Sequence, residues 1–90
     1  VCGTPTDIAK QLINDLEKMN RGRYAAPVGW IDANGDGEIA IALRCGLLLK
    51  DKKSMRIFAG CGIVAGSDPE TEFAESQAKL MPMRTALQML

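Results

Sequence analysis

Histidine is absent from the 90-residue sequence, and the aromatic residues number only one Trp, one Tyr and two Phe. The lack of histidine excludes imidazole acid–base chemistry. Basic and acidic residues number 11 each, so no charge excess points to a nucleic-acid or anionic-membrane partner. No apolar run approaches the roughly 20 residues that a membrane-spanning helix needs. With 47% hydrophobic residues the chain is nevertheless not expected to be disordered, and residues 1–90 make at most one small domain.

The cysteines are few and widely spaced, at Cys2, Cys45 and Cys61. An odd number without a CxxC pair fits neither a disulfide framework nor a zinc site. Reduced thiols in a cytoplasmic protein are the simpler interpretation. The sequence shows no signal peptide, and it opens on Val1 rather than Met, which suggests a piece of a longer protein.

Turn and cap residues divide the chain into two helices and three strands. Thr4 as N-cap and Pro5 at N1 predict a first helix that runs to about Met19. Ser67 or Asp68 is expected to cap the second helix, which Pro82 should kink or restart. The expected strands are 24–31, 38–49 and 55–64, with a turn at 32–37 and a charged loop at 50–54. The predicted fold class is α+β, in the order α-β-β-β-α with an antiparallel sheet.

The middle strand, 38–49, has two apolar faces. One face carries Ile39, Ile41, Leu43, Cys45 and Leu47, and the other carries Ala40, Ala42, Arg44 and Gly46. This pattern is typical of a sheet that is covered on both sides. Two helices would cover one face only, so the pattern indicates that more protein belongs against this sheet.

Arg44 lies on the small-residue face of that strand. A buried guanidinium needs an anionic partner, and the neighbouring Ala and Gly residues leave room for one. The partner would be either a ligand carboxylate or an Asp or Glu of the protein itself.

The stretch 58–79 is the strongest functional signal. Gly60 and Gly62 free backbone N–H groups before a helix start, which favours an anion there. Glu72, Glu75 and Lys79 then fall near one helix face, where paired carboxylates suit Mg²⁺. The alternative is a solvated face with a Glu75–Lys79 ion pair.

Residues 32–39 match the first eight positions of a calcium-binding EF-hand loop. The last ligand position of that loop, however, falls on Leu43 rather than on Glu, and strands rather than helices flank it. Asn-Gly and Asp-Gly pairs are also what a hairpin turn requires. Cys45, Cys61, Tyr24 and Trp30 are expected to pack as core side chains.

Several short blocks run in order along nearly the whole chain: Arg21-Gly22-Arg23-Tyr24, Val28-Gly29-Trp30, Ala42-Leu43-Arg44-Cys45, Ala59-Gly60-Cys61-Gly62-Ile63-Val64, Glu72-Phe73-Ala74-Glu75 and Lys79-Leu80. In combination they resemble the C-terminal part of the chorismate-utilising enzymes. That family includes isochorismate, salicylate, anthranilate and aminodeoxychorismate synthases. The Val28-Gly29-Trp30 block, Gly37-Glu38 after an acidic turn, and Arg44-Cys45 most resemble isochorismate synthase of siderophore or menaquinone pathways. Cys61 departs from the family, which usually has Ala between the two glycines.

The resemblance implies a role for each matching position. Glu72 and Glu75 match Mg²⁺-site carboxylates, and Lys79 matches a lysine that neutralises a chorismate carboxylate. Arg44 and Tyr24 match residues that hold the enolpyruvyl carboxylate. Backbone N–H groups at Gly60 and Gly62 would meet substrate carboxylates.

The family's catalytic Lys base and Glu acid match nothing in this segment and are expected upstream. The expected function is therefore Mg²⁺-dependent conversion of chorismate to isochorismate, by a protein of which this chain is a C-terminal segment that is inactive alone. The segment would need the remainder of the chorismate-binding domain as its partner. Two alternatives stay open: a pyruvate-releasing sister enzyme, and a non-catalytic binding domain.

Overall fold

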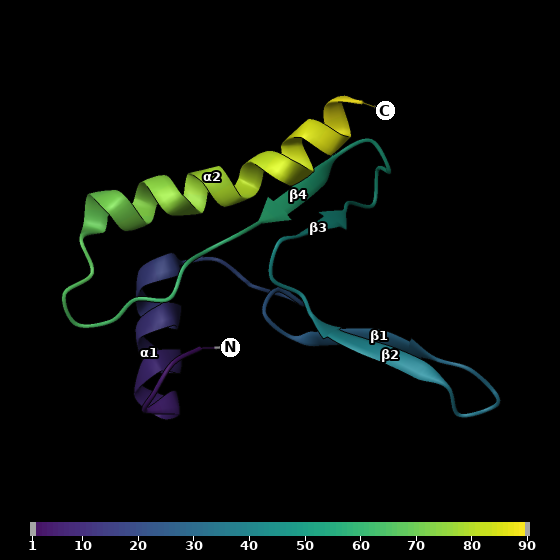
Figure 1. The fold of residues 1–90 in the computed structure, drawn as a ribbon, viewed down its shortest axis with the longest axis horizontal. Helices are drawn as coiled ribbons and strands as arrows, with labels where there is room; N and C mark the ends of the chain where they lie inside the picture. The colour runs from purple at the N-terminus through teal and green to yellow at the C-terminus, as the bar shows by residue number, and fades with distance from the viewer. Residues whose placement is uncertain (1, 90) are drawn as a thin grey trace. The chain divides into compact units, whose positions relative to one another are not determined.

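The computed structural model describes residues 2–89, which divide after Ala42 into two compact units. The first unit holds helix α1 (Thr6–Glu17) and strands β1 (Pro27–Ile31) and β2 (Gly37–Ile41). The second holds β3 (Cys45–Leu48), β4 (Met55–Phe58) and helix α2 (Pro69–Gln88), as labelled in Figure 1. The elements confirm the α+β class, but they form two small antiparallel sheets rather than a single meander.

Helix α1 begins one residue later than predicted. Pro5 occupies the N-cap position, and the Thr6 hydroxyl donates to the carbonyl of Gly3 at 3.3 Å. The helix ends at Glu17 because Lys18 adopts a left-handed conformation, with φ of 52°. Its apolar face carries Ile8, Leu12 and Leu16, all of which are exposed.

Strands β1 and β2 form the predicted hairpin, with Trp30 opposite Glu38 and Ile31 opposite Gly37. The Asp32 carboxylate closes the turn, since one oxygen accepts from the backbone N–H groups of Asn34 and Asp36 at 2.9 and 3.0 Å. An Asx turn of this kind is what Asp at a turn start provides. The residues that resemble an EF-hand loop therefore form the turn of a hairpin.

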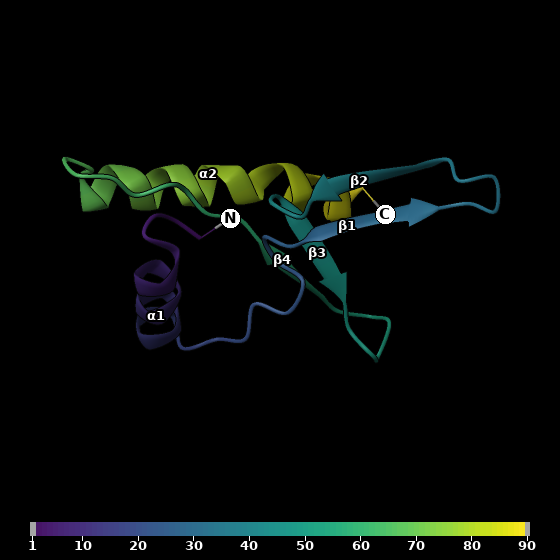
Figure 2. The same cartoon turned by 90° about the horizontal axis from the view of Figure 1, so that it is seen from below.

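In the second unit, β3 and β4 pair antiparallel, with Cys45 opposite Phe58. The Asp51 carboxylate orders the connecting loop by accepting from the backbone N–H groups of Lys53 and Ser54. Helix α2 packs against β4 (Figure 1). Pro82 lies inside α2, which runs from Pro69 to Gln88 and is drawn as one helix in Figure 2, so the predicted restart at Pro82 does not occur.

All three predicted strands are longer than the strands in the structure, and β1 begins three residues later than expected, at Pro27. The expected strand 38–49 is broken at 42–44, which gives β2 and β3 in its place. The expected strand 55–64 ends at Phe58, and the Gly-rich residues after it form no sheet. The two-faced alternation predicted for 38–49 therefore does not describe a continuous strand, because the bend at 42–44 resets the direction of the side chains.

Among residues 2–89 no side chain is buried. Large apolar side chains in both units are exposed, among them Trp30 at 56%, Ile39 at 65% and Phe73 at 67%. Independent domains rarely leave so many apolar side chains in water, because burial of apolar surface is the main force that stabilises them. The exposed side chains leave apolar faces of both sheets open to contact. No helix in the described part of the chain is long and apolar enough to cross a membrane.

Candidate functional site

Local hydrogen bonds set the junction between the Gly-rich loop and helix α2. The Asp68 carboxylate caps α2 by accepting from the backbone N–H of Thr71 at 2.9 Å and from its hydroxyl at 2.8 Å. These bonds hold the pKa of Asp68 below its ordinary value. The Ser67 hydroxyl oxygen accepts from the Val64 N–H at 2.9 Å. Of the two predicted caps, Asp68 is thus the cap, while Ser67 shapes the loop before it.

Lys79 joins the loop to the acidic face of α2. Its ammonium donates to the carbonyl oxygen of Gly60 at 3.2 Å and lies 3.0 Å from a carboxylate oxygen of Glu75. The predicted alternative, an ion pair within α2, is therefore present. The same ammonium also contacts the loop, a contact that a purely solvated helix face would lack. Residues predicted from two separate motifs thus meet at one cation.

Cys61 forms a second link between the loop and α2. Its sulfur lies 3.3 Å from the backbone carbonyl oxygen of Glu72, to which the thiol donates. This hydrogen bond is the main reason that the pKa of Cys61 is raised, so the residue remains a thiol at neutral pH. The prediction of a buried hydrophobe was wrong, because Cys61 is half-buried and acts as a donor. In the sequence, the feature that could have indicated this role was the position of Cys61 between two glycines ahead of a helix start.

Glu72 and Glu75 lie one helical turn apart on α2, half-buried and exposed respectively. Within residues 2–89 no third Asp, Glu, His or Cys joins them to form a larger ligand cluster. Two carboxylates fit Mg²⁺, which commonly takes one or two protein carboxylates and completes its shell with water and substrate oxygens. They would not form an all-protein cage for a larger cation. The metal-ligand roles of both residues stay a prediction.

The backbone of the loop has open space around it. A Cβ added at Gly62 would meet no atom within 4 Å, and the φ of Gly62 lies outside the left-handed region. The N–H groups of Cys61 and Gly62 form no hydrogen bond within the described residues. Glycine at position 62 is thus not required by the local fold, and its lack of a side chain leaves the amide backbone accessible.

Arg44 lies apart from the loop contacts. It falls in the bend between β2 and β3, where it is exposed, and it forms no ion pair or hydrogen bond in the part of the chain that the structure describes. The prediction that Arg44 lies on a covered sheet face is therefore wrong for this chain by itself, because the strand breaks at that residue. The guanidinium remains available to an anionic partner, and no acid among residues 2–89 neutralises it.

Tyr24 belongs to the first unit and is half-buried in a turn rather than in a strand. Its ring lies under the guanidinium of Arg21, with 5.1 Å between the guanidinium carbon and the ring centroid. Arg21 in turn binds Glu17 through two hydrogen bonds, of 2.8 and 2.6 Å. The chain at Ala25 takes a left-handed conformation, with φ of 67°, so β1 starts only at Pro27.

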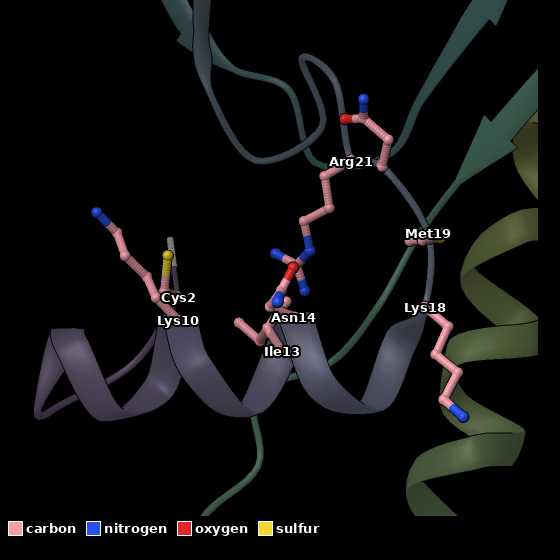
Figure 3. A pocket seen from close by; sticks show the side chains of 8 residues that line it. Cys2, Lys10, Ile13, Asn14, Lys18, Met19 and Arg21 are labelled. Atoms are coloured by element: carbon pink, nitrogen blue, oxygen red, sulfur yellow. The ribbon is translucent and has the colours of Figure 1, made fainter.

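The first unit also has a hollow of about 580 Å³ beside α1, shown in Figure 3. Its lining combines three cationic side chains, two amides, a thiol and two apolar side chains: Cys2, Lys10, Ile13, Asn14, Lys18, Met19, Asn20 and Arg21. None of the predicted site residues lines it. The hollow is therefore not the site that the sequence motifs predict.

Comparison with known proteins decides the family. Residues 1–88 match the family described as chorismate binding enzyme. This chain belongs to that family. The chain is 49% identical over 85 residues to isochorismate synthase MenF of Bacillus subtilis, and 45% identical over 87 residues to isochorismate synthase DhbC of the same organism. It is also 45% identical over 87 residues to anthranilate synthase component 1 of Saccharolobus solfataricus.

These alignments cover nearly all of this chain but only part of each relative. They span 94% of the chain and 18% of MenF, 97% and 21% of DhbC, and 97% and 20% of the anthranilate synthase component. The chain thus spans about a fifth of the length of these relatives. No solved structure matches it.

Proposed function

We propose that this chain forms part of the chorismate site of an isochorismate synthase, which converts chorismate to isochorismate without release of pyruvate. Family membership makes a chorismate-class ligand the expectation. The relatives named above as isochorismate synthases, together with the salicylate biosynthesis isochorismate synthase of Pseudomonas aeruginosa at 45% identity, support the isomerase branch.

The observation that carries the proposal is the meeting of loop and helix at Lys79. One ammonium contacts both the Gly60 carbonyl and the Glu75 carboxylate. A cation, a carboxylate pair and an open backbone loop side by side suit a dianionic ligand held with a divalent cation. Bound Mg²⁺ would supply positive charge against the ring carboxylate of chorismate.

Each predicted residue then has a defined task in substrate binding. The Arg44 guanidinium and the Tyr24 hydroxyl would hold the enolpyruvyl carboxylate, and the free guanidinium of Arg44 is suited to bidentate binding. The amides around Gly60 and Gly62 would donate to substrate carboxylates. Glu72 and Glu75 would hold Mg²⁺. Lys79 would add the positive charge that balances the second carboxylate.

The chain also needs catalytic groups that its own residues do not supply. None of the residues assigned here is a general base that would activate water, nor an acid that would protonate the departing hydroxyl. We propose that both come from the part of the protein that corresponds to the other four-fifths of the relatives. The same polypeptide would cover the exposed apolar faces described above. The segment alone should therefore not turn over chorismate, and we expect the whole protein to be cytoplasmic.

One alternative has specific support. The similarity to anthranilate synthase component 1 keeps open a sister enzyme that eliminates pyruvate from chorismate. Both branches would use the same carboxylate and Mg²⁺ contacts, so the residues of this chain do not separate them. A non-catalytic chorismate-binding domain would keep the contacts and lack turnover.

Proton NMR of chorismate with Mg²⁺ and the intact protein tests the proposal. Accumulation of isochorismate without pyruvate is the expected result. Formation of pyruvate with an aromatic product would assign the protein to the sister branch. Chorismate binding without turnover would support the non-catalytic domain, and turnover by residues 1–90 alone would contradict the expectation that acid and base lie elsewhere.

A further inference from the structure

The peptide group between Gly60 and Cys61 is held on one side and open on the other. Its carbonyl oxygen accepts from the Lys79 ammonium at 3.2 Å. The peptide is trans, and in a planar trans peptide the C=O and N–H bonds point in opposite directions. The N–H of Cys61 therefore points away from the Lys79 ammonium. Within residues 2–89 it has no hydrogen-bond acceptor.

We propose that Lys79 is a positioning residue, which orients the Gly60–Cys61 peptide so that the Cys61 N–H donates to a chorismate carboxylate. This inference rests on the proposed function and adds an amide donor and a cause for its orientation. A carboxylate bound to the Cys61 N–H would lie on the opposite side of the peptide from the ammonium. Lys79 would then act on that carboxylate through the peptide group rather than by contact.

Two physical effects make the arrangement useful for anion binding. A cation that binds the C=O group polarises the peptide, and hydrogen-bonded groups in series strengthen one another, so the N–H becomes a better donor. The Lys79 side chain is only 25% exposed, which reduces competition from water for its hydrogen bonds. An ammonium has three donors, and the contacts to Gly60 and Glu75 use two of them. Lys79 can thus keep both partners together.

The Cys61 thiol restrains the same peptide from its other end. Its hydrogen bond to the Glu72 carbonyl lies two helical turns before Lys79 on α2. The two hydrogen bonds together hold consecutive residues, Gly60 and Cys61, against one helix. A peptide held at two points has little freedom to flip, and a preorganised donor loses less entropy on binding.

The experiment is NMR of the intact protein labelled with ¹⁵N-cysteine, because the Cys61 amide belongs to the peptide in question. Lys79→Met removes the ammonium while it keeps an apolar chain of similar length, and Lys79→Arg keeps a cationic donor. Lys53→Met, in the exposed β3–β4 loop, is the matched control for loss of one positive charge. The Cys45 amide is the internal reference in the spectra of the free protein.

In the free protein we expect Lys79→Met to shift the Cys61 amide resonance and to leave Cys45 in place, with a smaller shift for Lys79→Arg and none for Lys53→Met. An unmoved Cys61 resonance in Lys79→Met would overturn the inference. In the wild type, chorismate should then shift the Cys61 amide, and this response should be lost in Lys79→Met. If chorismate is converted but the Cys61 amide does not respond, the inference fails while the proposed function stands. If chorismate does not bind at all, the proposed function fails, and the donor role of Cys61 fails with it.

Discussion

The substitution Gly62→Ala separates a ligand role for the Gly-rich loop from a structural one. A Cβ at this position meets no atom within 4 Å, and the backbone conformation is one that alanine can adopt. Such a Gly→Ala change stabilises a protein by about 0.4–1 kcal/mol, because it reduces the freedom of the unfolded chain. In a protein of 150 residues or more that corresponds to a rise in Tm of about 1–4 °C.

Gly62→Ala is expected to weaken substrate binding, although it stabilises the fold. If a chorismate carboxylate approaches the amides of the loop, the new methyl group would push it away from at least one N–H donor. The loss of one hydrogen bond to a charged group costs about 1.5–3 kcal/mol, which is an increase of about 10- to 150-fold in KM. Steady-state kinetics with chorismate and a thermal unfolding curve, both on the intact protein, measure the two effects.

Gly29→Ala is the matched control, since a Cβ at that position would collide with the backbone of Glu38 on the neighbouring strand. It should lower Tm and leave KM nearly unchanged. The reasoning is refuted if Gly62→Ala leaves both KM and Tm as in the wild type, because the loop would then contact no substrate. A large fall in Tm would show instead that polypeptide packs against Gly62.

Arg44→Ala should raise the KM for chorismate about 10- to 150-fold, because a charge-assisted contact is lost; an unchanged KM, or an equal effect of Arg56→Ala on β4, would contradict the assignment. Glu75→Gln should raise the Mg²⁺ concentration at half-maximal activity by about tenfold or more, since an amide is a poorer ligand for a hard cation. Glu70→Gln, in the exposed first turn of the same helix, should not change that midpoint, and equal midpoints for both variants would exclude Glu75 as a ligand. Asp68→Ala should lower Tm at neutral pH by removing the cap of α2. Because the folded-state pKa of Asp68 is lowered, its contribution is complete above the unfolded-state pKa of about 3.9 and is lost as the pH falls through the folded-state value. The Tm difference from the wild type should therefore close below about pH 4, and a constant difference down to pH 2 would show that the carboxylate charge has no part in it.

Features that depend on near neighbours in the chain were predictable from the sequence. The hairpin turn follows from Asp32 and its contacts to residues two and four positions later. The start of α2 follows from Asp68 and Pro69, whose capping contacts lie within one turn. Family membership likewise came from short blocks read in order, without any knowledge of contacts.

Features that depend on distant neighbours or on side-chain direction were not predictable. The alternation from Ile39 onward favoured one long strand, and only the structure places the break at 42–44, because β2 pairs with β1 while β3 pairs with β4 in a separate sheet. From the sequence, Lys79 was expected either to be solvated or to pair with Glu75. Nothing in the sequence indicated that the carbonyl of Gly60 is a second acceptor for it.

What the sequence alone determined, then, is the family, the α+β class, the hairpin turn, the helix cap and the identities of the candidate ligands, since each is encoded in local pattern or in ordered motifs. What only the tertiary structure decided is which of those residues meet. Packing of α2 against β4 brings Lys79 to Gly60 and Glu72 to Cys61, across 19 and 11 residues of chain. Contacts at that separation depend on how the elements pack, and no local spacing in the sequence specifies them.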